Sequence, residues 1–77
     1  MTVVFIFKSG KVSKITVNQL QEEDILQKIK NFFSQGYTDD NRYLMIEDEG
    51  KHFFVDLGDV SAVEVVKQNR RVRQWLL

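Results

Sequence analysis

Two segments of this chain, residues 3–17 and 43–57, have the pattern of β-hairpins, and together they leave apolar side chains on both faces of a sheet. In each segment, two runs rich in β-forming residues flank a short turn that contains glycine. Successive side chains of a strand point to opposite faces, so the pairing of two strands decides which residues share a face. The turn of each hairpin therefore predicts how its apolar residues are divided.

In the first hairpin, Ser9 and Gly10 have the composition of a two-residue turn, because glycine readily adopts positive φ. This turn pairs Phe7 with Val12 and Val4 with Ile15. The face without charge is then expected in the core, and it carries Val4, Ile6, Ser13, Ile15 and Val17. The opposite face carries Val3, Phe5, Phe7, Val12, Lys14 and Thr16.

In the second hairpin, a two-residue turn at Glu49 and Gly50 sets Asp48 opposite Lys51. One face is then wholly apolar and carries Leu44, Ile46, Phe53 and Val55. The other face carries Tyr43, Met45, Glu47, His52, Phe54 and Asp56. A slip of one residue would turn Glu47 and Asp56 toward the core, so this register is well specified.

The segment between the hairpins predicts one amphipathic helix. Asn18 is a candidate N-cap, and Gly36 is suited to follow the last turn. The apolar residues of this segment recur with helical spacing and are Ile25, Leu26, Ile29, Phe32 and Phe33.

The last third of the chain has two interpretations. Ser61 and Glu64 have the spacing of a capping box, which favours a helix toward Trp75. The density of valines at residues 60–66 favours a strand instead. We predict a fifth strand at residues 62–67, followed at residues 68–77 by a short helix or an arm.

These elements predict an α+β protein in the order β-β-α-β-β-β, with an antiparallel sheet of two hairpins and a fifth strand. A chain of 77 residues has room for one domain. We assign it to residues 1–67 and treat residues 68–77 as a basic C-terminal segment. The helix is expected to pack on the sheet face formed by Val4, Ile6, Ile15, Leu44, Ile46, Phe53 and Val55.

The composition favours a cytoplasmic protein. Cysteine is absent, which excludes disulfides and thiolate sites. No apolar run approaches the roughly 20 residues that span a bilayer. The apolar start of the chain lacks the basic leader of a signal peptide, and we interpret it as a strand.

Candidate residues for chemistry are few. His52 faces Glu47 in the predicted register, but it lacks a second histidine, a cysteine or a nucleophile. The acidic turn at residues 47–50 lacks the ligand spacing of a calcium loop, and Gly10 belongs to no phosphate-binding motif. We expect no catalytic residue, no metal site and no cofactor.

The charge is divided between the two parts of the chain. Four of the 11 basic residues follow Glu64, the last of the 11 acidic residues, so the end carries +4 and the rest −4. These residues are Lys67, Arg70, Arg71 and Arg73. Arginines beside Trp75 suit nucleic-acid binding, in which the ring stacks on a base. They also suit docking on the acidic domain or on a neighbouring molecule.

The second sheet face has more apolar residues than one helix covers, and such patches mark interfaces. The candidate interface residues are Phe5, Phe7, Val12, Met45, Phe54 and Trp75. We predict a non-enzymatic binding or regulatory module whose partner is a protein, with a homodimer as the expected form. Nucleic-acid binding through Arg70, Arg71 and Arg73 is the alternative, and no membrane partner is expected.

Two patterns resemble those of short single-domain proteins of Gram-positive bacteria and their phages whose function is uncharacterised. One is residues 5–11, Phe-Ile-Phe-Lys-Ser-Gly-Lys. The other is residues 53–57, which lead through Asp59 and Val60 into residues 63–65. The resemblance implies a cytoplasmic accessory protein and assigns no functional residue.

Overall fold

A computed structural model describes residues 1–36, 38, 41–67 and 70–76, with only the backbone at residues 70–72 and 75. The elements are β1 (Thr2–Phe7), β2 (Val12–Thr16), α1 (Glu22–Gln35), β3 (Tyr43–Asp48), β4 (Lys51–Asp56), a 3-10 turn η1 (Leu57–Asp59), β5 (Val60–Lys67) and β6 (Arg70–Leu76). The α+β class, the antiparallel pairing and the order β-β-α-β-β-β are therefore confirmed, and β6 is added at the end.

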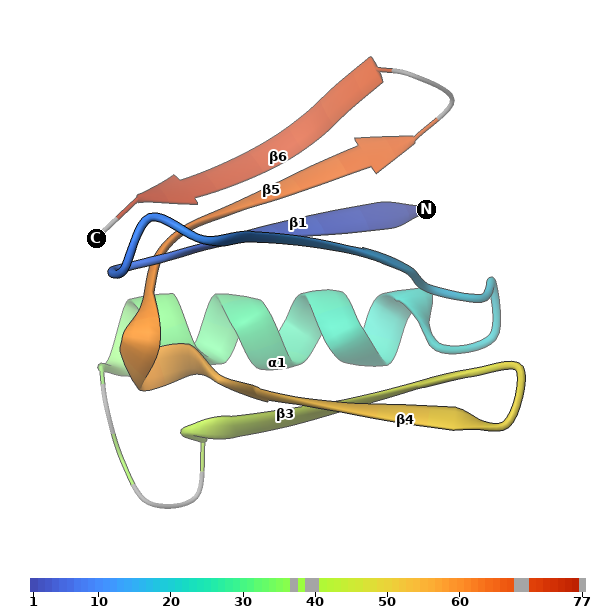
Figure 1. The fold of residues 1–77 in the computed structure, drawn as a ribbon, viewed down its shortest axis with the longest axis horizontal. Helices are drawn as coiled ribbons and strands as arrows, with labels where there is room; N and C mark the ends of the chain where they lie inside the picture. Colours follow the sequence, from blue (N-terminus) through green and yellow to red (C-terminus); the bar gives the residue numbers. More distant parts are fainter. Residues whose placement is uncertain (37, 39–40, 68–69, 77) are drawn as a thin grey trace.

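The strands form two sheets, and α1 lies between them (Figure 1). One sheet has four strands in the order β2-β1-β5-β6, and the other is the hairpin β3-β4. We expected both hairpins to share one helix-covered face. Instead, the chain leaves β4, turns through η1 and continues as β5, which pairs with β1 in the other sheet. The helix therefore has a sheet on each of two sides and contacts apolar residues of both.

The register of the first hairpin differs by one residue from the expected one, so our assignment of β1 to its faces was wrong. Val3 pairs with Ile15 and Ile6 with Val12. The Phe7 N–H donates to the Lys11 carbonyl at 2.9 Å, which leaves a three-residue loop closed by Gly10 at φ 91°. A third loop residue in a left-handed conformation is a common hairpin ending. Consequently Val3 and Phe5 are fully buried, while Val4 and Ile6 point to the outer face and are half-buried.

The register of the second hairpin is confirmed from Tyr43↔Asp56 to Asp48↔Lys51. Glu49 and Gly50 both have positive φ, 48° and 79°, as a type I′ turn requires. Leu44, Ile46 and Val55 are buried on the inner face. The opposite-charge pair beside the turn and the alternation of the strands therefore specify this register.

The helix begins later than the Asn18 cap suggests. The Asn18 side-chain oxygen accepts hydrogen bonds from the Leu20 and Gln21 N–H groups, which stabilises a turn before α1. At the other end, the Gly36 N–H donates to the Phe32 carbonyl and Gly36 has φ 82°. Gly36 therefore ends the helix as expected.

The C-terminal segment forms a β-strand, so the expectation of a short helix or an arm was wrong for residues 70–76. β6 pairs with β5 from Ala62↔Leu76 to Lys67↔Arg70, with an irregularity between Val65 and Val66. Backbone pairing along β5 therefore orders this segment as the edge strand of the four-stranded sheet.

One apolar core joins the three layers. It contains residues of the four-stranded sheet, of α1 and of the hairpin, and both Ile29 and Ile46 are fully buried in it. The helix supplies Ile25, Ile29 and Phe32, while Leu26 and Phe33 are half-buried against the same cluster. The apolar residues of α1 thus serve both sheets.

Glu22 fixes the start of α1 to the four-stranded sheet. Its carboxylate lies 3.1 Å from the Met1 ammonium nitrogen and 3.4 Å from Lys67 Nζ. The hydrogen bond from the Met1 ammonium lowers the pKa of Glu22, against the opposing effect of burial.

The corrected register of β1 predicts opposite outcomes for two neighbouring valines. Val3→Ala removes two buried carbons and should lower the free energy of unfolding by about 2–3 kcal/mol. Val4→Ala, on the outer face, should lower it by less than about 1 kcal/mol. Urea unfolding of both variants measures the difference. A larger loss for Val4→Ala would restore the register that we first derived.

Candidate interaction surface

The predicted interface residues do not share one face. Phe5 is fully buried in the core, so its assignment to an exposed interface was wrong. Phe7 is half-buried against the core, and Val12 is 56 % exposed on the outer face of the four-stranded sheet. Met45 and Phe54 lie opposite each other on the outer face of the hairpin. The Trp75 side chain lies outside the described residues.

The outer face of the hairpin carries the densest group of exposed apolar side chains in the described part of the chain. Tyr43 is 60 % exposed, Met45 48 % and Phe54 73 %. Met45 is the cross-strand neighbour of Phe54, and Tyr43 is two residues from Met45 on the same face. We call these three residues the hairpin patch. Sequence reasoning omitted Tyr43 from the interface, although the alternation of β3 already placed it beside Met45.

The exposed apolar residues of the four-stranded sheet are more widely separated. Val12 lies on β2 and Leu76, 69 % exposed, lies on β6. These are the two outermost strands, so the two side chains are about 14 Å apart. Ile6, between them, is half-buried. Ala62, which pairs with both Ile6 and Leu76, is buried, so the strongly exposed side chains of this row lie at the two edges of the sheet.

A salt bridge fixes the base of the hairpin, beside the patch. Arg42 Nε and Nη2 donate to the two carboxylate oxygens of Asp56 at 2.9 and 2.6 Å. The Gly58 N–H donates to the same carboxylate at 2.9 Å, and the Leu57 N–H donates to the Arg42 carbonyl at 2.8 Å. These bonds hold the point at which the chain leaves the hairpin for the four-stranded sheet.

Arg42 also contacts the patch directly. Its guanidinium carbon lies 4.9 Å from the centre of the Tyr43 ring, within the range of a cation–π contact. The Tyr43 ring is thereby held at the base of the hairpin with its other surface exposed. One edge of the hairpin patch is therefore preorganised.

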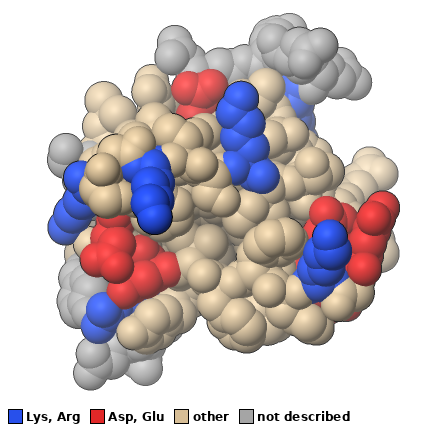
Figure 2. Space-filling view, in the orientation of Figure 1, with Lys and Arg blue, Asp and Glu red and all other residues tan. Residues whose placement is uncertain are grey.

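The other end of the hairpin is acidic. Glu47, Asp48 and Glu49 surround the turn, and Lys51 and His52 follow it. Glu47 and His52 face each other across the strands and both are exposed. Figure 2 shows acidic and basic side chains side by side at this end, with a broad uncharged region between the two ends of the molecule. The patch thus lies between an acidic tip and a base where Arg42 and Asp56 neutralise each other.

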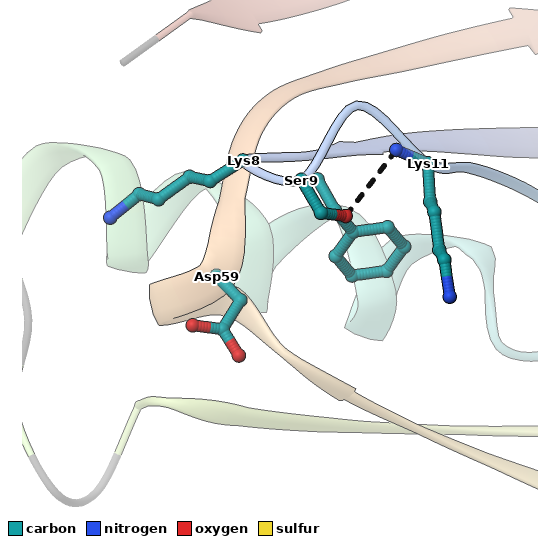
Figure 3. Close-up of a pocket in the computed structure, with 5 residues that line it drawn as sticks. Lys8, Ser9, Lys11 and Asp59 are labelled. Carbon is teal, nitrogen blue, oxygen red and sulfur yellow. Dashed lines mark hydrogen bonds between the residues drawn. The ribbon is translucent and has the colours of Figure 1, made fainter.

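A separate hollow of about 420 Å³ lies beside the first hairpin turn and is lined by Phe7, Lys8, Ser9, Lys11 and Asp59. The Lys11 N–H is 3.4 Å from Ser9 Oγ, and the Lys8 N–H donates to the Asp59 carbonyl at 2.8 Å. In Figure 3 the side chains of Lys8 and Lys11 extend to opposite sides of the hollow. The carboxylate of Asp59 lies below the turn, between them in this view. Charges of both signs therefore line this hollow.

The described residues contain no group of three or more histidine, cysteine or acidic side chains that could hold a metal ion. His52 lies on the exposed face of the hairpin opposite Glu47, as the register predicted. The expectation that the chain has no catalytic or cofactor-binding residue stays a prediction.

The basic segment occupies β6. Arg73 and Gln74 are exposed, whereas the side chains of Arg70 and Arg71 lie outside the described residues. Nucleic-acid binding by these arginines therefore stays a prediction. No helix in the described part of the chain is long and apolar enough to cross a bilayer.

No protein family, curated protein sequence or solved structure matches this chain. The resemblance to short proteins of Gram-positive bacteria and their phages stays a prediction. The geometry of the surface is therefore the basis on which a function is proposed.

The Arg42–Asp56 pair predicts a specific loss of stability in acid. The hydrogen bond from Arg42 lowers the pKa of Asp56 below its ordinary value of 3.8, burial opposes this effect, and the Gly58 N–H adds to it. A lowered pKa means that the folded state binds the proton less readily than the unfolded state. The stabilisation is thus complete well above pH 3.8 and is lost as the pH falls through the lower pKa of the folded protein.

Asp56→Asn tests this prediction. The variant should be less stable than the parent at about pH 7, and the difference should shrink toward about pH 2. Chemical unfolding at several pH values measures both proteins. A difference that stays constant over this range would show that the Asp56 charge does not stabilise the folded state.

Proposed function

We propose that this protein is a small non-enzymatic binding module that associates with a second copy of itself through the hairpin patch. The observation that carries the proposal is the exposure of Tyr43, Met45 and Phe54 side by side on one face of a two-stranded sheet. At these exposed fractions the patch amounts to on the order of 300 Å² of apolar surface. The largest apolar patch on a monomer of ordinary composition is of this order, and it is often the functional surface.

The architecture of the hairpin supports a partner on its outer face. A two-stranded sheet is marginally stable in water unless something packs on it. The inner face of β3-β4 packs on α1, and the outer face has no described cover. A second apolar layer on the outer face would exclude water from the Met45–Phe54 pair.

The charge distribution supports a second copy in one orientation. Two hairpins stacked face to face lie about 10 Å apart, with a twofold axis between them. An axis along the strands would place tip over tip and bring together Glu47, Asp48 and Glu49 of both copies. An axis across the strands places the acidic tip of one copy over Arg42 of the other. The second arrangement keeps the two acidic tips apart, places each over the neutralised base of the other copy and retains the contact between the two patches.

The area of the patch supports a weak association. Stable interfaces bury about 800 Å² on each partner, more than the patch alone provides. The flanking polar residues, including Arg42, Glu47 and His52, would complete the contact as a rim. We therefore expect a weak dimer, which dissociates into monomers when the protein is diluted to low micromolar concentration.

Phe54→Ser removes the most exposed aromatic side chain of the patch. Because Phe54 is 73 % exposed within one chain, the variant should keep its fold while its dimer dissociation constant rises by at least about tenfold. Sedimentation equilibrium over a range of concentrations measures this constant, and circular dichroism checks the fold.

Val12→Ser is the matched control, since Val12 is also exposed but lies on the four-stranded sheet. Its dissociation constant should equal that of the parent. A monomeric parent at all concentrations, or a dimer weakened by Val12→Ser and not by Phe54→Ser, would overturn the proposal.

A further inference from the structure

We propose that β6 accepts an extended acidic peptide, which pairs with it and becomes a fifth strand of the four-stranded sheet. β6 is the last strand of the order β2-β1-β5-β6, so among the described residues it pairs with β5 on one side only. Figure 1 shows β6 at the outer edge of this sheet, on the far side of α1 from the hairpin. The edge is thus separate from the hairpin patch.

The backbone of β6 is suited to strand addition. An edge strand has a row of backbone N–H and carbonyl groups that a further strand can use, and several peptide-binding domains recognise ligands in this way. β6 runs for seven residues, Arg70–Leu76. The segment contains neither proline nor glycine, which would weaken the pairing.

Charge determines which peptide fits. Arg70, Arg71 and Arg73 lie in β6, and no acidic residue follows Glu64 in the chain. Cross-strand pairs of opposite charge stabilise a sheet, and like charges directly opposite destabilise it. Two copies of β6 paired antiparallel about their centre would place Arg73 opposite Arg73. This register of two β6 strands is therefore disfavoured, whereas a strand with Glu or Asp places opposite charges across the edge.

The other edges of the molecule have a different character. β2 is shorter, with five residues, and carries one lysine, Lys14. The two strands of the hairpin meet at the acidic turn, since β3 ends there and β4 begins there. An acidic peptide would therefore be repelled at this end of either strand. β6 is therefore the longer of the two edge strands of the four-stranded sheet, and its charged residues are all basic.

The test is fluorescence anisotropy with the full chain and a labelled seven-residue peptide that alternates Glu and Val. A second peptide has Lys in place of Glu. A third has Pro in place of the Val residues, which keeps the charge and removes backbone donors. The first peptide should bind, its affinity should fall with added salt, and the other two should bind at least about tenfold more weakly.

Arg73→Glu reverses one charge of β6 and should weaken binding of the acidic peptide by about tenfold. Lys14→Glu makes the same change in net charge on the opposite edge of the sheet and should leave the affinity unchanged. Amide hydrogen exchange provides a second readout: residues of β6 should exchange more slowly when the peptide is bound.

Three results would overturn this inference: no binding, equal binding of the Pro-containing peptide, or equal weakening by Lys14→Glu. The second would show attraction by charge without strand pairing, and the third a response to net charge alone. Phe54→Ser should not alter the affinity for the peptide. Failure of the hairpin dimer and failure of this strand addition are therefore distinguishable.

Discussion

The contact between the apolar residues of α1 and both sheets is the interaction on which the rest of the structure depends. The hairpin β3-β4 has two strands and would be marginal alone, so Leu44, Ile46 and Val55 need the cover that α1 provides. On the other side, α1 covers Val3 and Phe5 of the four-stranded sheet. With one short helix between two sheets, a single core can be built from 77 residues.

The sequence predicted a hairpin register correctly where polar residues distinguish the outer face of the strands from the core face. The opposite-charge pair Asp48–Lys51 beside the turn, with Glu47 and Asp56 on the face opposite Leu44 and Ile46, defined the second hairpin. The first hairpin lacked such marks, because β1 is apolar from residue 3 to residue 7 and either face suits a core. One extra residue in its turn shifts the register, so that Val3 and Phe5 lie in the core in place of Val4 and Ile6. For residues 70–76 the sequence suggested a short helix or an arm, whereas pairing along β5 makes this segment a strand.

The apolar residues that we expected on one exposed sheet face are divided in the structure between the core and the surface. Phe5 enters the core because the register of the first hairpin differs by one residue from the expected one, and the remaining exposed group is smaller and lies on the β3-β4 hairpin. The sequence paired Met45 with Phe54 correctly, since both belong to the well-specified register. It did not predict the Arg42–Asp56 salt bridge, because Arg42 precedes β3 and its approach to Asp56 depends on how η1 leaves the hairpin. The proposed dimer and the proposed peptide edge thus use surfaces on opposite sides of α1.

Contacts between two copies can be observed directly by isotope-filtered NMR on a mixture of labelled and unlabelled protein. The chain has two methionines, so a sample labelled at the methionine methyl groups reports on Met45 with little overlap. The account predicts contacts from the Met45 methyl group of one copy to the Phe54 ring of the other. Contacts between copies that involve only the outer face of the four-stranded sheet, near Val12 and Leu76, would contradict it.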